Sequence, residues 1–442
     1  MTQYKLSRYS HLLNHRGERV LYHSLKMKLV SIGESEIDIN RRAINISRDS
    51  ELYNILSKEG FICLSDNSDE ELLEIYRNEI QEPYISTAYF FLTKNCNLAC
   101  KYCFEKQSEV ANTKEGIMSI GTFDKGLDFF VRLINLDKER FDERKTIIFY
   151  GGEPFHNKVV LYHAIEKIKD YILFGILPQK TKILVVTNGT LLDDNDISFI
   201  KKHDVTLTFS LDGDKEASIN RVFPDLRTLA WEIATKNFKK CKEIGIDLNV
   251  ACTLTPQTIE RRSEVLDYFI NTVEATNIGF NVILDNDIIQ LDGDYDNAAA
   301  DFVSSAYFEL TEHNITENRT GRRLQVFEKK HPCLFDCNAA GGRQIAIAPD
   351  GSVGICHEHI MDKKHFITDI FDDTFDPAQS SMYKEWQKRS PLYMPECYDC
   401  PALGICGGGC VINTERKFTT IHKPDTRFCK QTLSILENIL LK

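Results

Sequence analysis

Short apolar runs alternate with amphipathic segments through the middle of the chain. In the amphipathic segments apolar residues recur every three or four positions, which indicates helices, whereas the runs are nearly continuous, as in buried parallel strands. Six strands separated by helices predict an α/β fold, a partial (βα)6 TIM-like barrel. The predicted strands are 86–93, 146–150, 182–187, 205–211, 247–254 and 278–284, and the clearest helices are 123–135, 159–174 and 230–244.

A smaller block precedes the barrel. Two candidate strands, 9–14 and 19–32, flank a turn at Gly17, and helical patterns follow over 50–59 and 69–80. Strands followed by helices predict a separate α+β domain ahead of the barrel. The predicted domains are 1–83, the barrel at 84–290, a helical linker at 291–330 and a cysteine-rich domain at 331–442.

Composition limits the cellular compartment and the kinds of partner that we expect. The chain has 442 residues and 42% hydrophobic content, enough for several cores. No signal-like segment follows the polar amino terminus, and no apolar run nears the ~18 residues that cross a bilayer. We therefore expect a cytoplasmic protein without a membrane partner, whose fourteen cysteines are metal ligands rather than disulfides. A net charge of −11 argues against nucleic acid as the main partner.

Cys96, Cys100 and Cys103 directly follow the first predicted barrel strand. A [4Fe–4S] cluster has four irons, so three thiolates would leave one iron open to bind a small molecule. The alternative is a zinc knuckle completed by a distant fourth ligand. In a parallel βα sheet the chemistry lies at the carboxyl ends of the strands, where this loop is expected.

Polar residues follow three further strands. After the second strand comes Gly151-Gly152-Glu153-Pro154, where glycines allow close approach, proline fixes the turn and the carboxylate can accept bonds from an ammonium group. Thr187 and Asn188 end the third strand, and Ser210 and Asp212 end the fourth. These side chains are candidates to bond ribose hydroxyls, and ordinary turn chemistry is the alternative.

The Cys-x3-Cys-x2-Cys loop, with Tyr102 before its last cysteine, and the Gly-Gly-Glu-Pro turn resemble the motifs of radical S-adenosylmethionine (SAM) enzymes. The resemblance implies that the three cysteines hold a SAM-binding [4Fe–4S] cluster. It also implies that Tyr102, the Gly-Gly-Glu-Pro turn and the later strand ends contact SAM. Arg221 is the candidate to face the SAM carboxylate, although the His-Asp pair that precedes this position in the family is missing here and the spacing is one residue shorter.

Cysteines gather again in the last part of the chain, where Pro349-Asp350-Gly351 predicts a turn between two short strands. The cysteine spacing resembles the SPASM domain, an extension of radical SAM enzymes that modify peptides. It implies two auxiliary [4Fe–4S] clusters, three clusters in all, with structural zinc ribbons as the alternative. The implied ligands are Cys337, Cys356 and Cys410, with Cys333 a candidate fourth, for the first auxiliary cluster, and Cys397, Cys400, Cys406 and Cys429 for the second.

The resemblance implies an oxidoreductase that reductively cleaves SAM to a 5′-deoxyadenosyl radical. The radical would take hydrogen from a residue of a precursor peptide, and a cross-link would follow, preferably a Cys thioether. In element order, residues 1–83 resemble winged-helix-like domains that bind the leader peptides of ribosomally made natural products. A packing cap on the barrel is the alternative. An electron donor such as a flavodoxin or ferredoxin is the other implied partner.

Two other functions stay open. Sulfatase maturases that make formylglycine share both cysteine patterns, but in that group an Asp follows the cysteine that matches Cys356, and His357 stands here. His357 is the candidate general base because imidazole transfers protons near neutral pH, and a solvent-facing or supporting role is the alternative. The other function is a non-catalytic iron–sulfur electron carrier or zinc-scaffold binding protein.

Overall fold

A ten-stranded sheet forms the centre of the computed structural model, which describes residues 2–15, 17–33, 36–38, 42–103, 116–284, 288–360 and 363–441. Its strand order is β13-β12-β11-β10-β9-β8-β7-β14-β15-β16. The six predicted barrel strands are confirmed, and neighbouring strands among them are parallel. They are β7 (Thr87–Thr93), β8 (Thr146–Gly151), β9 (Lys182–Thr187), β10 (Thr206–Ser210), β11 (Leu248–Leu254) and β12 (Asn277–Val282).

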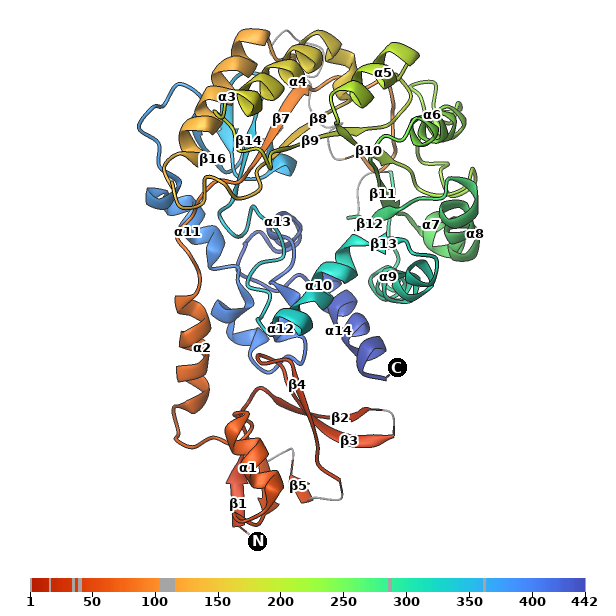
Figure 1. The fold of residues 1–442 in the computed structure, drawn as a ribbon. Helices are drawn as coiled ribbons and strands as arrows, with labels where there is room; N and C mark the ends of the chain where they lie inside the picture. The colour runs from red at the N-terminus through yellow and green to blue at the C-terminus, as the bar shows by residue number, and fades with distance from the viewer. Residues whose placement is uncertain are drawn as a thin grey trace.

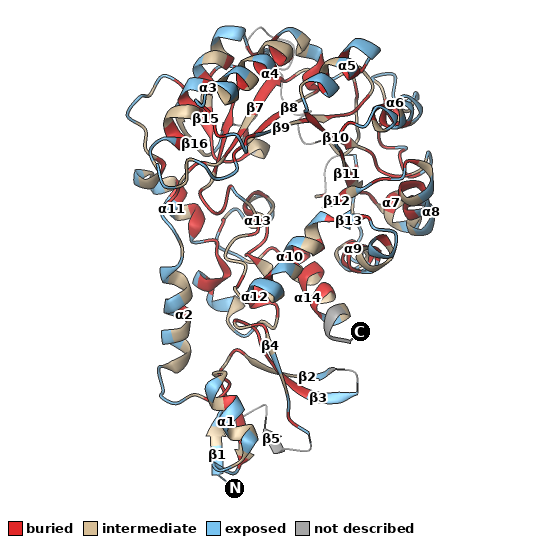
Figure 2. Ribbon diagram, viewed as in Figure 1, coloured by how far each residue is buried: buried red, intermediate tan, exposed pale blue. Residues whose placement is uncertain are grey.

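Helices cover the outer face of this curved sheet, and the buried residues concentrate between the two layers (Figures 1 and 2). Side chains alternate along each strand. Phe90 and Phe149 point outward and pack around Phe123 of α3, with ring centroids 5.0 and 6.1 Å away. Burying each such ring contributes about 1.5–3 kcal/mol. The helices are α3 (Ile120–Ile134), α4 (Lys158–Leu173), α5 (Asp194–Lys202), α6 (Trp231–Glu243), α7 (Pro256–Glu260), α8 (Arg262–Asp267) and α9 (Tyr295–Glu312).

The cysteine-rich region extends the same sheet. Its strand β14 (Gln344–Ile347) is parallel to β7, while β15 (Ser352–Gly354) and β16 (Phe366–Asp369) continue antiparallel. The predicted turn at 349–351 is confirmed, with Gly351 at a φ of +89°. The sequence did not predict the pairing of β14 with β7. This pairing brings the segment after β15 to the inner face of the barrel.

The remaining carboxyl-terminal elements are mostly helical. The predicted helical linker contains α9 and α10, and α9 packs on the last helix, α14, where the hydroxyls of Ser304 and Ser434 are 2.8 Å apart. In the part of the chain that the structure describes, no helix has the length and apolar character to span a membrane. The other elements are β13 (Thr316–Glu317), α10 (Asn318–Lys329), α11 (Ser381–Gln387), α12 (Leu403–Cys406), α13 (Val411–Phe418) and α14 (Thr426–Leu441).

The amino-terminal block consists of two three-stranded antiparallel sheets and two helices. Both predicted helices are confirmed, but the single strand predicted over 19–32 is two strands, because the chain turns between them and Met27 has a φ of +49°. The elements are β1 (Thr2–Lys5), β2 (Ser10–His15), β3 (Glu18–His23), β4 (Lys28–Ser31), β5 (Glu36–Asp38), β6 (Ala43–Ile46), α1 (Glu51–Lys58) and α2 (Ser68–Asn78).

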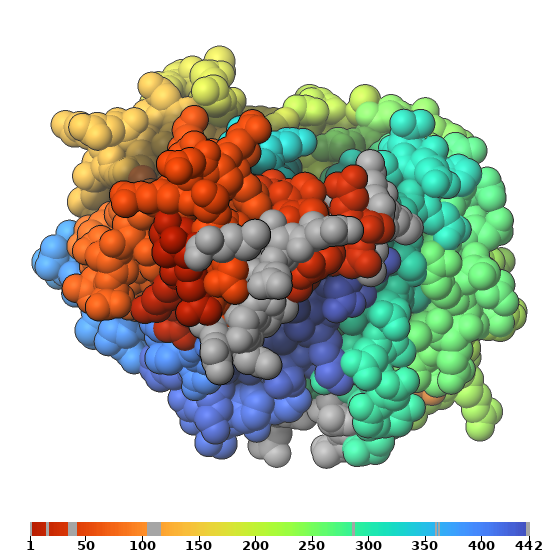
Figure 3. Space-filling view, turned by 90° about the horizontal axis from the view of Figure 1, so that it is seen from below, coloured from red at the N-terminus to blue at the C-terminus, as the bar shows by residue number. Residues whose placement is uncertain are grey.

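This block lies on the cysteine-rich region, at the opposite end of the molecule from the barrel (Figures 1 and 3). Tyr9 and Leu25 are buried in one apolar cluster with Leu392 and Leu403. A Cβ added to Gly404 would lie 2.1 Å from the Ser24 carbonyl oxygen, so the two main chains are in direct contact. The block therefore packs on the cysteine-rich region, and the alternative in which it caps the barrel does not match this packing.

Candidate active site at the barrel edge and the cysteine sets

The first cysteine loop is bonded to the Gly-Gly-Glu-Pro turn through the main chain. The N–H of Gly152 donates to the Thr93 carbonyl (2.9 Å), and the N–H of Glu153 donates to the Asn95 carbonyl (2.8 Å). A Cβ on Gly152 would lie 2.2 Å from the Asn95 oxygen, so the contact requires glycine. Gly151 has a φ of +138°, and the buried Pro154 opens a 3-10 turn. The two motifs therefore meet at one edge of the barrel.

The Glu153 carboxylate is fully buried at this edge. It accepts hydrogen bonds from the Phe155 N–H (3.2 Å), the Thr187 hydroxyl (2.8 Å) and the Asn188 N–H (2.7 Å). Burial raises the pKa of Glu153 to about 7, and these hydrogen bonds oppose that rise. A carboxylate has about four acceptor positions, so one further donor, such as an ammonium group, can be accommodated.

Asn188 connects the end of β9 to the cysteine loop. Its Nδ2 lies 3.7 Å from the Cys96 sulfur and donates to Asn97 Oδ1 (3.0 Å). Asn97 in turn donates to the Thr190 hydroxyl (2.7 Å). Amide donors directed at a ligating sulfur tune a bound cluster. Asn97 and Thr190 were not among the predicted site residues, although Asn97 stands between two cysteines of the motif.

Tyr102, Asp212 and Arg221 form one buried network. The Tyr102 hydroxyl donates to Asp212 (2.5 Å) and accepts from Arg221 Nη1 (2.6 Å), while the Thr253 N–H donates to the other Asp212 oxygen (2.9 Å). Burial raises the pKa of Asp212, and the neighbouring Arg221 opposes that rise. Three predicted cofactor contacts thus lie together and hold the cysteine loop against the end of β10, where Ser210 is half-buried.

His357 lies on the inner face of the sheet, between β7 and β8. Its ring stacks on Tyr89 with centroids 4.5 Å apart and meets Tyr150 edge-on at 5.3 Å. Burial lowers the pKa of His357, so the imidazole is neutral near pH 7. Its Nδ1 is buried and has no hydrogen-bond partner among the described residues. The side chain is therefore half-buried rather than solvent-facing, with the protonation state that a base needs.

The carboxyl-terminal cysteines fall into two neighbourhoods. Burial raises the pKa of Cys356, and Glu358, Cys337 and Cys410 add to that rise. The three cysteines also pack in the same apolar cluster. In the same way, burial raises the pKa of Cys397 to about 12, and Cys406, Cys429 and Cys400 contribute to that rise. The second set is Cys397, Cys400, Cys406 and Cys429.

Cys333 packs in one cluster with a cysteine of the second set. The negative charges that raise its pKa, after burial, come from Asp336 and Cys406, and its side chain packs in one cluster with Cys400. Its thiol donates to the Phe335 carbonyl (3.3 Å). Cys333 and Cys337 both lie near Arg322, and Cys333 as the fourth ligand of the first set stays a prediction.

The thiols do not converge as around a single ion. All fourteen cysteines are free of disulfides, and among the described residues no three His, Cys, Asp or Glu side chains are arranged to hold one metal ion. A [4Fe–4S] cluster binds each thiolate at a different iron, so its ligands are spaced more widely than around one Zn²⁺.

Charges around the cysteines suit anionic clusters. Asp336, between Cys333 and Cys337, is buried and pairs with both Arg322 (2.9 Å) and Arg323 (3.3 Å). One carboxylate thus faces two guanidinium groups, and the buried Nε of Arg323 has no partner among the described residues. Buried cations need anionic partners, and cluster-bound thiolates supply negative charge at this place. The residues present therefore fit iron–sulfur clusters.

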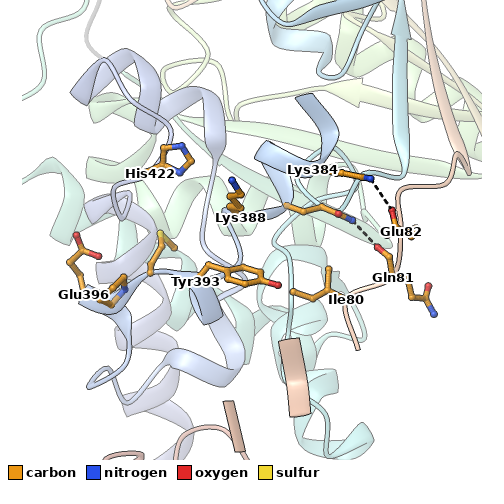
Figure 4. A pocket seen from close by; sticks show the side chains of 11 residues that line it. Ile80, Gln81, Glu82, Lys384, Lys388, Tyr393, Glu396 and His422 are labelled. Atoms are coloured by element: carbon orange, nitrogen blue, oxygen red, sulfur yellow. Dashed lines mark hydrogen bonds and ion pairs between the residues drawn. The ribbon is translucent and has the colours of Figure 1, made fainter. Parts of the chain in front are cut away.

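Two hollows lie outside the barrel. A cavity of about 670 Å³ opens between Ile80–Glu82, α11 and Tyr393–Glu396 (Figure 4). A smaller groove of about 370 Å³ follows β2 along Ser10–Leu13 and continues to Asp399.

Comparisons with known proteins agree with this geometry. Residues 90–269 match the model of the Radical SAM superfamily. The chain is 25% identical over 373 residues to the antilisterial bacteriocin subtilosin biosynthesis protein AlbA of Bacillus subtilis (strain 168), covering 81% of this chain and 74% of AlbA. It is 26% identical over 335 residues to the cysteine-type anaerobic sulfatase-maturating enzyme of Clostridium perfringens (strain 13 / Type A), covering 72% of this chain and 86% of that enzyme.

Among solved structures, the chain is similar to Streptococcus suis SuiB. The TM-score is 0.52 at 16% identity for SuiB bound to S-adenosylmethionine, and 0.51 at 14% identity for SuiB bound to precursor peptide SuiA. Both comparisons cover 96% of this chain and 99% of SuiB, so the shared fold includes the amino-terminal block. The cysteine-rich carboxyl-terminal region fits a SPASM-like domain.

Proposed function

The chain is an enzyme with a radical SAM domain at residues 90–269, and from this premise we propose that it is a peptide maturase that forms a Cys thioether cross-link. The observation that carries the proposal is the pairing of β14 with β7. This pairing brings Cys356 and His357, which follow β15, beside the inner face of the barrel that carries the SAM motifs.

When bound, SAM and the three [4Fe–4S] clusters supply the one-electron chemistry: a 5′-deoxyadenosyl radical that takes a hydrogen atom from a peptide carbon, and an acceptor for the electron left after the cross-link forms. The ligands are proposed to be Cys96, Cys100 and Cys103 for the SAM-binding cluster, with the auxiliary sets as described above. Glu153 is proposed to accept the SAM ammonium group, and Ser210 the ribose. The bonded network of Tyr102, Asp212 and Arg221 fixes the loop that carries these three cysteines.

The thiol proton needs an acceptor, and His357 is proposed for that role. The peptide loses one hydrogen atom from carbon and one proton from sulfur, so the net change is the loss of two hydrogens. A neutral imidazole stacked on Tyr89 is poised to accept that proton. If Cys337, Cys356 and Cys410 are its only protein ligands, the first auxiliary cluster has room for a substrate thiolate at its fourth iron.

The amino-terminal block is proposed to bind the leader of the precursor peptide. Within the described residues β2 pairs only with β3, so its other edge is available to an added strand. The groove along Ser10–Leu13 borders that strand and has Leu6 and Leu21 as apolar lining. A flavodoxin or ferredoxin is the proposed electron donor, and the fourteen thiols suit the reducing cytoplasm.

A formylglycine-making sulfatase maturase is the second candidate. It is favoured by the likeness to the Clostridium perfringens enzyme. Against it stands His357, which occupies the position where that group has an Asp.

Anaerobic reconstitution and co-expression with a precursor peptide test the proposal. A candidate precursor is a short Cys-containing peptide encoded beside the gene. We expect about twelve irons per chain, four for each cluster, release of 5′-deoxyadenosine from SAM, and a peptide lighter by two hydrogens. An aldehyde at a sulfatase cysteine would favour the second candidate. Zinc binding without SAM cleavage would contradict both candidates.

A further inference from the structure

Arg389, two residues after α11, is fully buried in the cysteine-rich region. Its guanidinium donates to the main-chain oxygens of Lys423 and Gly408 and approaches the Thr414 hydroxyl at 3.4 Å. Among the described residues, its buried Nε has no hydrogen-bond partner and no carboxylate forms an ion pair with its guanidinium. A buried guanidinium in such surroundings is unfavourable unless another negative group compensates it.

The nearby carboxylate is already occupied. Asp425 is buried and pairs with Arg427, with Nη2 3.2 Å and Nε 3.3 Å from its oxygens. The other ionisable groups near Arg389 are cysteine thiols, which carry negative charge only as thiolates, the form that binds metal. Burial lowers the pKa of Arg389, and Cys410, Asp425, Cys406 and Cys397 oppose that change, in that order.

These thiols are divided between the two proposed auxiliary clusters. Cys410 belongs to the first set, and Cys397 and Cys406 to the second. The glycine segment between Cys406 and Cys410 is also fixed to this arginine. A Cβ on Gly408 would lie 2.1 Å from the Arg389 carbonyl oxygen, and the Gly408 oxygen accepts from the guanidinium.

We propose that Arg389 is a positioning residue shared by the two auxiliary clusters, whose buried positive charge compensates their negative charge and raises their reduction potentials. The inference rests on the auxiliary clusters of the proposed function and adds a residue that the cysteine motifs do not contain. A fixed cation stabilises the reduced form of a cluster, which carries one more negative charge than the oxidised form. Hydrogen bonds to Gly408 and Lys423 hold the cation beside the segment that joins Cys406 of the second set to Cys410 of the first.

The test compares Arg389→Met with Lys388→Met in the reconstituted full chain. Lys388 is the adjacent residue, and its substitution removes the same positive charge. Its side chain is exposed, pairs with Glu385 (2.8 Å) and borders the cavity of Figure 4. Cluster potentials are measured by redox titration followed by electron paramagnetic resonance. We expect more negative auxiliary potentials in Arg389→Met and wild-type values in Lys388→Met. Arg389→Lys, which keeps the charge, is expected to restore part of the shift.

The SAM-binding cluster is the internal reference, and its potential is expected to stay unchanged. A second measurement covers the case in which Arg389→Met loads iron poorly. Cluster loading should raise the melting temperature of the wild type more than that of Arg389→Met, because the cluster-free variant no longer buries an uncompensated charge.

Wild-type auxiliary potentials in Arg389→Met, or equal gains in melting temperature on loading, would overturn the role of Arg389 while leaving the maturase proposal intact. A wild-type chain that holds only four irons yet cleaves SAM would overturn this inference together with the auxiliary clusters of the proposed function, and would leave its SAM chemistry intact. Absence of SAM cleavage in the fully loaded wild type would instead overturn the proposed function.

Discussion

The barrel edge and the cysteine-rich region reach charge balance in different ways. At the barrel edge the chain satisfies its own buried charges: Asp212 pairs with Tyr102 and Arg221, and Glu153 accepts three donors. In the cysteine-rich region two guanidinium groups share Asp336, and Arg389 has no carboxylate partner among the described residues. The first site is therefore preformed by the protein, whereas the second depends on what its cysteines hold.

The largest expected effects come from removing one ligand in each region. Cys100→Ala should reduce SAM cleavage to background while about eight irons per chain remain, because the auxiliary sets are separate. Cys406→Ala should do the reverse, losing auxiliary iron while SAM is still cleaved. Iron analysis and chromatography of 5′-deoxyadenosine measure both effects, with Cys63→Ala, outside every motif, as the control. Loss of SAM cleavage in both variants would mean that the two regions are not independent.

Gly152→Ala should disturb the contact between the cysteine loop and the Gly-Gly-Glu-Pro turn and leave the cysteine-rich region unchanged. The new methyl group would collide with the Asn95 carbonyl oxygen, so the cysteine loop must move. We expect a loss of about 1–3 kcal/mol in the free energy of unfolding and weak SAM binding. Gly121→Ala is the matched control, since only the Ser119 hydroxyl at 3.8 Å lies near its added Cβ. Equal SAM affinity in the two variants would show that this close contact is not required.

Glu153→Gln tests the barrel edge by titration. Burial raises the pKa of Glu153 from 4.5 to about 7, so its contribution to the stability of the unliganded protein is full below about pH 4.5 and is lost as the pH rises through about 7. Binding an ammonium group needs the ionised form, so SAM affinity should rise between about pH 6 and 7.5. In Glu153→Gln the affinity should be roughly tenfold lower and nearly independent of pH. Calorimetry at several pH values measures both, and an unchanged pH slope in the variant would remove Glu153 from SAM binding.

The smallest expected effect is at the contact between the amino-terminal block and the cysteine-rich region. Asp399, next to Cys400, pairs with Arg8 (3.1 Å) and Arg42 (2.6 Å), but these groups are partly exposed. Asp399→Asn should therefore cost less than about 1 kcal/mol. Gly404→Ala should cost more, because its Cβ would overlap the Ser24 main chain. Denaturant unfolding of the two variants compares the ion pairs with the packing, and a larger loss in Asp399→Asn would reverse their order.

The barrel edge was also the more predictable region. Each barrel strand lies within two residues of its predicted bounds, and the Gly-Gly-Glu-Pro turn meets the cysteine loop as expected, because both depend on local patterns and on strand order. The pairing of β14 with β7 and the burial of Arg389 depend on contacts between distant segments, which a sequence pattern does not specify. The strand predicted over 19–32 was wrong at its centre, where Met27 adopts a left-handed conformation without being glycine.

The most direct test of the proposed peptide chemistry follows the abstracted hydrogen. A precursor peptide is deuterated at the carbon that becomes cross-linked and is incubated with the reduced, reconstituted enzyme and unlabelled SAM. Mass spectrometry should find one deuterium in 5′-deoxyadenosine for each peptide molecule that loses its deuterium and its thiol hydrogen. A modified peptide with unlabelled 5′-deoxyadenosine would contradict the account.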